Sequence, residues 1–133
     1  AMKPTIQVGN SASFTFCVTP EMQPNFGGET VHPVCSTWDM AHQFELAARQ
    51  TLEPHLDEDE QGIGSFISID HCAPAPVGKT VFVEAIISEI DESSVVCTLS
   101  AKIDSLVCAT GKQVQRVLPC SIIDSLIEKA ASQ

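Results

Sequence analysis

Three residues whose side chains can do acid–base chemistry, Thr37, Glu45 and His71, occupy informative positions in the expected secondary structure. The stretch 38–53 has apolar residues at steps of three and four, which predicts an amphipathic helix, and Glu45 falls within its apolar stripe. The stripe consists of Trp38, Ala41, Phe44, Ala48 and Leu52. A carboxylate directed at a core is costly unless paired, so proteins tend to keep one there for a function. The structural alternative is a partly exposed glutamate at the edge of a crowded helix.

Thr37 lies at the expected start of this helix, and His71 ends an expected strand over 63–71. The structural explanation of Thr37 is an N-cap, a role that Ser36 can equally fill. The functional explanation adds a hydroxyl beside free N–H groups at the positive end of the helix dipole, where a carbonyl oxygen or an anion can be held. His71 precedes a loop and is placed to meet a group from the helix, although a lone histidine there is more often a structural residue.

The rest of the pattern predicts the elements that must position these side chains. Further strands are expected over 13–18, 80–90, 95–103 and 106–118, with a bulge near Gly111, and a short amphipathic helix is expected over 121–131. The segment 19–34 is rich in Pro, Gly and Asn and is expected to be a long loop of the kind that often forms lids. The acidic run 57–60 is interpreted as a solvated loop.

One apolar helix and one antiparallel sheet predict a two-layer α+β domain that spans residues 2–133. Four strands follow the helix in hairpin sequence, which fits a curved sheet wrapped around one long central helix, the hotdog arrangement. A single sheet over one helix leaves sheet surface and edges to cover. We therefore expect a homodimer, and further assembly of the dimer stays open.

Composition narrows the classes of function. The formal net charge is −10 and the seven basic residues are scattered, which argues against nucleic acid and anionic membranes as partners. No apolar run is long enough to cross a bilayer. The six cysteines form no C-x-x-C pair, which argues against zinc-ribbon and thioredoxin-like sites, and we expect neither metal nor cofactor. Together with the lack of a leader segment, this pattern predicts a reduced, cytoplasmic protein.

A series of short motifs along residues 8–120 carries a family resemblance. In order they are Thr37, Phe44-Glu45-Leu46-Ala47, Leu52-Glu53-Pro54-His55-Leu56, Gly64-Ser65-Phe66-Ile67, His71, Ala75-Pro76-Val77-Gly78, Val81-Phe82-Val83-Glu84-Ala85 and Gln115-Arg116-Val117. Each motif is weak alone. Their joint order, with Glu45 and His71 twenty-six positions apart, resembles the fluoroacetyl-CoA thioesterase-like branch of the hotdog thioesterase superfamily.

The resemblance implies a homodimeric acyl-CoA thioesterase that uses Thr37, Glu45 and His71 to hydrolyse a small acyl thioester. It also implies that Gly64 lets the backbone approach the thioester. In such an enzyme Glu45 either activates water or attacks the thioester itself. His71 would carry the proton to the CoA thiolate or orient the water, and Thr37 would hold Glu45 or the substrate.

The loop before the helix departs from the family pattern. The fluoroacetate-specific enzyme carries phenylalanines there that form a lid, whereas the matching stretch 27–33 has no aromatic residue. Selectivity for fluoroacetyl groups is therefore not expected, and Val31 in this loop and Arg116 in the last strand are the expected further substrate contacts. Two alternatives stay open: a non-catalytic hotdog module that binds acyl-CoA or only dimerises, and a hotdog hydratase or dehydratase, whose Asp and His pairing the chain lacks.

Overall fold

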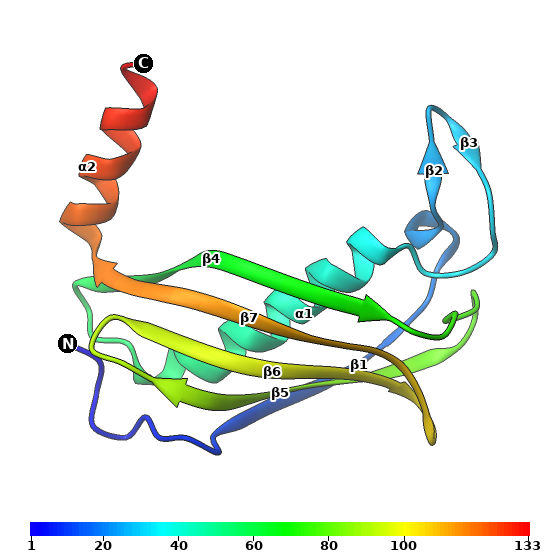
Figure 1. Ribbon diagram of the computed structural model, residues 1–133, viewed down its shortest axis with the longest axis horizontal. Helices are drawn as coiled ribbons and strands as arrows, with labels where there is room; N and C mark the ends of the chain where they lie inside the picture. Colours follow the sequence, from blue (N-terminus) through cyan, green and yellow to red (C-terminus); the bar gives the residue numbers. More distant parts are fainter.

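A computed structural model describes all residues, 1–133, as an antiparallel sheet that packs against one long helix (Figure 1). The five strands lie in the order β1-β5-β6-β7-β4. Their bounds are β1 Ser11–Cys17, β4 Glu60–His71, β5 Thr80–Ile90, β6 Ser94–Ile103 and β7 Leu106–Pro119. The helix α1 spans Thr37–Leu52 and contacts all five strands, so the sheet wraps around it. This arrangement confirms the predicted α+β fold.

Smaller elements complete the chain. The 3-10 turns are η1 Pro20–Met22 and η2 Glu53–His55, and the loop before α1 holds a small hairpin of β2 Asn25–Phe26 and β3 Glu29–Thr30. The C-terminal helix α2, Cys120–Ala131, continues directly from β7 and projects away from the sheet with no buried residue (Figure 1). None of the helices combines the length and the apolar character needed to span a membrane.

Helix α1 begins at a side-chain cap. Ser36 has an extended backbone, and its Oγ accepts a hydrogen bond of 3.2 Å from the N–H of Asp39. The sequence left the cap open between Ser36 and Thr37, and Ser36 is the residue that fills it. The hydroxyl of Thr37 is therefore free for another partner.

The buried face of α1 is rotated from the predicted stripe. It comprises Met40, Gln43, Phe44, Ala47, Ala48, Thr51 and Leu52. Trp38, expected in the stripe, is 53% exposed, and Glu45 is exposed as well. The prediction that Glu45 points into the core is wrong, because Met40 and Ala47 face the sheet and turn Glu45 to the edge of the contact. The alternative of a glutamate at the edge of a crowded helix describes its position.

Strand β4 lies at an edge of the sheet and pairs only with β7. The expected hairpin sequence is wrong at this point, since the segment 72–79 carries the chain across to β5 on the far side of β6 and β7.

The prediction of a solvated acidic loop over 57–60 is wrong at its last residue, because β4 begins at Glu60. Glu60 is 5% exposed and its Oε2 accepts a hydrogen bond of 3.0 Å from the N–H of Asp57, so it belongs to the sheet.

A register shift between Gly64 and Phe66 interrupts the β4–β7 pairing. The extra residue reverses the alternation of side chains. Ile63 pairs with Arg116 and lies on the outer face, whereas Ile67 lies on the inner face. The sequence had placed both isoleucines on one face, because strict alternation contains no bulge.

The bulge predicted at Gly111 is absent, since this residue pairs regularly with both neighbouring strands. The absence of a side chain at Gly111 allows close packing instead. A Cβ at Gly111 would collide with the carbonyl oxygen of Ser68 and would lie 3.1 Å from the Phe44 ring. The glycine thus lets α1 approach the middle of the sheet closely.

Candidate active site

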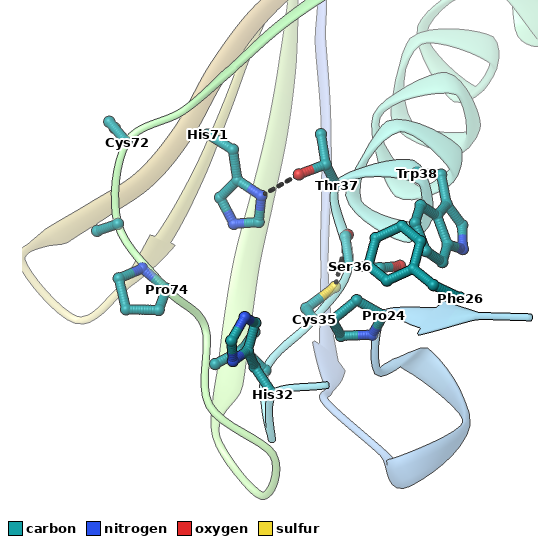
Figure 2. A pocket seen from close by; sticks show the side chains of 12 residues that line it. Pro24, Phe26, His32, Cys35, Ser36, Thr37, Trp38, His71, Cys72 and Pro74 are labelled. Atoms are coloured by element: carbon teal, nitrogen blue, oxygen red, sulfur yellow. Dashed lines mark hydrogen bonds between the residues drawn. The ribbon is translucent and has the colours of Figure 1, made fainter. Parts of the chain in front are cut away.

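Thr37 and His71 meet where the start of α1 faces the end of β4. Thr37 Oγ1 and His71 Nδ1 are 3.0 Å apart and hydrogen-bonded (Figure 2). The other ring nitrogen, Nε2, is buried and has no hydrogen-bond partner. Burial lowers the pKa of His71 below its ordinary 6.5, so the imidazole is neutral at pH 7. The pair therefore presents a neutral histidine of fixed orientation with one nitrogen free to exchange a proton.

This pair lies in the wall of a pocket of about 560 Å³ (Figure 2). The wall consists of the loop before α1, the first residues of α1, and the segment that follows β4. Its residues are Pro24, Phe26, His32, Val34, Cys35, Ser36, Thr37, Trp38, His71, Cys72, Ala73 and Pro74. A largely apolar cavity of this size with a few convergent polar groups is typical of a small-molecule site.

An aromatic pair forms one side of the pocket. The rings of Phe26 and Trp38 meet edge to face, with centroids 5.6 Å apart and an interplanar angle of 83°. Both are exposed, Phe26 by 62% and Trp38 by 53%. The sequence pattern did not predict a role for Phe26. The signal that could have found it is the turn at Gly27 and Gly28, whose positive φ angles of 65° and 91° close the β2–β3 hairpin and present the ring.

Glu45 lies against the backbone of β4 at Gly64. A Cβ on Gly64 would be 2.9 Å from Glu45 Oε1, so the carboxylate occupies space that any other residue would fill. One turn further along α1, Arg49 donates a hydrogen bond of 3.1 Å to the carbonyl oxygen of Gly62. The helix is thereby held to this strand, and the position of Glu45 is set by the close approach of the two backbones.

Within one chain, Glu45 and the Thr37–His71 pair stand apart. Glu45 does not line the pocket. Eight residues of helix separate it from Thr37, which is about 12 Å along the axis. Along β4, Gly64 and His71 are seven residues apart, which is about 23 Å of extended chain. The structure thus divides the predicted catalytic residues into two groups.

The two other predicted contacts lie outside both groups. Val31 is 47% exposed and its N–H donates to the carbonyl oxygen of Pro24 at 3.1 Å. It is not part of the pocket wall, although the next residue, His32, is. Arg116 is exposed on the outer face of the sheet beside Ile63, on the side away from α1, and forms no ion pair.

Cys35, in the wall of the pocket, is a poor candidate for chemistry. All six cysteines in the chain are free thiols, and Cys35 and Cys72 line the pocket. Burial, with a smaller effect from Asp39, raises the pKa of the Cys35 thiol to about 12, which keeps it protonated and unreactive. No group of three or more His, Cys, Asp or Glu side chains is placed to hold a metal ion.

Comparisons with known proteins place the chain in a family. Residues 18–121 match the family described as fluoroacetyl-CoA-specific thioesterase. A hypothetical protein of Thermus thermophilus, a thioesterase superfamily member, is 32% identical over 97% of this chain and 96% of that chain, with a TM-score of 0.92. No match was found among curated proteins.

Two more distant structures share the fold. A threonine-to-serine variant of the fluoroacetyl-CoA thioesterase FlK, solved with acetyl-CoA, is 21% identical over 94% of this chain and 98% of that chain, with a TM-score of 0.84. A hot-dog-like protein from Thermanaerovibrio acidaminovorans is 19% identical over 96% of this chain and 93% of that chain, with a TM-score of 0.83. The family match spans well over half of the chain. The chain therefore belongs to the fluoroacetyl-CoA-specific thioesterase family, and it is a thioester hydrolase with the hotdog fold.

Proposed function

We propose that this protein hydrolyses a small acyl-CoA to the free acid and CoA, with Glu45 as general base, His71 as proton shuttle and Thr37 as the residue that positions His71. The observation that carries the proposal is the 3.0 Å Thr37–His71 hydrogen bond in the wall of the pocket. The single domain over residues 2–133 and the cytoplasmic location, both inferred from sequence, are part of this proposal.

The chemistry follows from the neutral histidine. Glu45 takes a proton from water as the water oxygen attacks the thioester carbonyl carbon. The tetrahedral intermediate then collapses, and the bond between carbon and sulfur breaks. With Nδ1–H donating to the Thr37 hydroxyl, His71 Nε2 is free to accept the proton from Glu45 and pass it to the CoA thiolate. Acyl-CoA and water are thus converted to acid and CoA, and both side chains return to their starting states.

This sequence of steps needs Glu45 and His71 in one site, and a dimer supplies it. The free edge of β4 carries Ile63, Phe66 and Ile67, which are 40%, 53% and 39% exposed. Pairing two such edges would cover these side chains and satisfy the unpaired backbone groups. Antiparallel pairing about a two-fold axis between Ile67 and Ser68, a little past the middle of β4, would place His71 of the partner subunit opposite Gly64. Each site then combines one chain's Glu45 with His71 of the partner subunit.

The substrate class follows from the pocket. Its volume of about 560 Å³ and its aromatic side suit a short acyl group and the adjoining thioester. The FlK variant solved with acetyl-CoA supports the same class. Phe26 and Trp38 supply an aromatic wall from positions outside the stretch 27–33. We therefore expect the pocket to select acyl groups differently from the fluoroacetate-specific enzyme. Val31 and Arg116, both exposed, stay predicted contacts for the outer part of CoA.

Release of CoA thiol from a panel of short acyl-CoAs tests the activity. The panel includes acetyl-, fluoroacetyl-, propionyl- and butyryl-CoA, and the wild-type protein is expected to release thiol from at least one of them. Glu45→Gln and His71→Asn are each expected to abolish most of this release. If the wild type releases thiol from none, the non-catalytic hotdog module becomes the better explanation.

A mixed-dimer experiment tests the composite site. Glu45→Gln and His71→Asn subunits are dissociated, mixed in equal amounts and allowed to reassociate. Half of the dimers then contain one chain of each kind, and one of their two sites has both residues, so about a quarter of the wild-type activity should return. The matched control mixes wild type with the double variant. The control should fall from half to about a quarter of the wild-type activity if the site is composite. If mixing the single variants restores nothing while native mass spectrometry shows that mixed dimers form, the composite site is wrong.

A further inference from the structure

The side-chain amide of Gln113 has no hydrogen-bond partner within the fold. It lies on the inner face of β7 opposite Ile67, is 1% exposed and makes no side-chain hydrogen bond, with Oε1 buried and unpaired. Gln115, two residues along the same face, is 2% exposed, and its Nε2 donates to the carbonyl oxygen of Ala48 at 3.1 Å. The two glutamines share strand, face and burial. Gln115 links the sheet to the helix by a hydrogen bond, whereas Gln113 makes no hydrogen bond that would explain an amide at its position.

An unpaired amide in the interior lowers stability, since it has given up its hydrogen bonds to water. An apolar residue of similar size would avoid that loss. Such a group is therefore best explained by a partner that is present only during function.

The position of Gln113 indicates what that partner is. The point that a Cβ of Gly64 would occupy is 3.4 Å from Gln113 Nε2 and 2.9 Å from Glu45 Oε1. A donor from β7 and an acceptor from α1 thus converge on one point above the backbone of β4. Because residue 64 is an exposed glycine, no side chain of β4 stands between these two groups and solvent.

We propose that Gln113 is a positioning residue that orients the attacking water above Gly64. The inference rests on the proposed function, in which Glu45 is the general base. The water donates one O–H to Glu45 and accepts a hydrogen bond from Gln113 Nε2–H, which leaves a lone pair of its oxygen directed at the thioester carbon. As the new bond between oxygen and carbon forms, the proton passes to Glu45, and Gln113 stays neutral throughout.

The test compares Gln113→Met with Gln115→Met. Methionine has a similar length and no donor, so Gln113→Met is expected to lower kcat by about 10- to 100-fold and leave KM nearly unchanged. Its melting temperature is expected to equal or exceed that of the wild type, because an unpaired amide is removed. Gln115→Met is expected to do the reverse, with a lower melting temperature and nearly wild-type kcat. A wild-type kcat in folded Gln113→Met overturns the inference.

A second variant and a reference variant complete the test. Gln113→Glu keeps the shape of the side chain but loses the donor, so it is expected to show a similar loss of kcat, and a wild-type kcat in this variant also overturns the role of Gln113. Glu45→Gln distinguishes failure of the proposed base from failure of the role of Gln113. If it is fully active, the assignment of the base fails and the role of Gln113 fails with it. If it is inactive while Gln113→Met is fully active, only the role of Gln113 fails.

Discussion

Two pairs of polar side chains lie between α1 and the sheet, and they are held in place by different means. Thr37 and His71 are joined by a direct hydrogen bond of 3.0 Å in the wall of the pocket. Glu45 and Gln113 share no hydrogen bond and instead converge on the space above Gly64. The first pair is oriented by bonding between its members. The second is oriented by the close packing of the backbones that carry it, so the missing side chain at Gly64 is as important as the side chains themselves.

This difference predicts different responses to substitution. Changing a member of the Thr37–His71 pair should affect orientation and protonation, whereas changing the Gly64 region should affect the space for the reacting group. For most site residues, a neighbour with only a structural role provides the control.

The largest effect is expected for Glu45→Gln. Loss of a general base typically lowers the rate by about 10²- to 10⁴-fold, and we expect a fall of that size in kcat for thiol release. The melting temperature should not change, because Glu45 is exposed and makes no ion pair. Glu53→Gln on the same side of the protein is the control, since it removes only the exposed pair with Arg49. Equal activities of the two variants would contradict the assignment of Glu45.

The next largest effect on kcat is expected at Gly64, and Gly62, two residues earlier on β4, provides the control. In Gly64→Ala the new methyl group would lie 2.9 Å from Glu45 Oε1, so kcat should fall by about tenfold or more while the protein stays folded. In Gly62→Ala the methyl group would lie 2.6 Å from Leu52 Cδ2, in the core. Such overpacking costs about 1–3 kcal/mol, which should appear as a lower melting temperature. The opposite pattern would show that Gly64 serves packing alone.

A similar comparison applies to the start of α1. Thr37→Val removes the hydroxyl that bonds His71 Nδ1, and kcat is expected to fall by about tenfold as the imidazole loses its orientation. Ser36→Ala removes the N-cap and is expected to cost about 1 kcal/mol of stability with little effect on kcat. Thr37→Ser keeps the hydroxyl and should restore activity. A fully active Thr37→Val would contradict the positioning role.

The smallest effect concerns pH. Burial lowers the pKa of His71 below 6.5, so the neutral, proton-accepting form persists at pH 7, and kcat/KM should fall only as the pH drops through this lowered value. In the same window the unfolded chain binds the proton more readily. The stability that comes from a neutral His71 is therefore complete above about pH 6.5 and declines as the pH falls towards the folded pKa. In His71→Asn the melting temperature should depend less on pH as the pH falls below about 6.5, which thermal melts at several pH values measure.

The local pattern of the chain was enough to predict most elements. The helix was predicted over 38–53 and is found over Thr37–Leu52, because its apolar period, its capping residues and Pro54 are local signals. The strands at Thr80–Ile90 and Ser94–Ile103 were predicted to within a residue for the same reason. The family was recognised from the order of short motifs, and the comparisons confirm it.

Contacts between distant segments decided what these local signals left open. The rotation of α1 places the Glu45 carboxylate against Gly64 and the Phe44 ring against Gly111, and no period within the helix contains that information. The bulge in β4 reverses the faces of its side chains, and the crossing to β5 leaves β4 at the edge of the sheet.

The sequence by itself therefore determined the types of the reactive residues and the elements that carry them. It could not show that Thr37 forms a hydrogen bond with His71, because 34 positions separate them along the chain. Nor could it show that Gln113 lies near Glu45, which is 68 positions away. Their proximity depends on how strands and helix pack, which is a property of the whole core. Secondary structure follows from interactions between near neighbours, whereas the arrangement of this site follows from backbones that only the tertiary fold brings together.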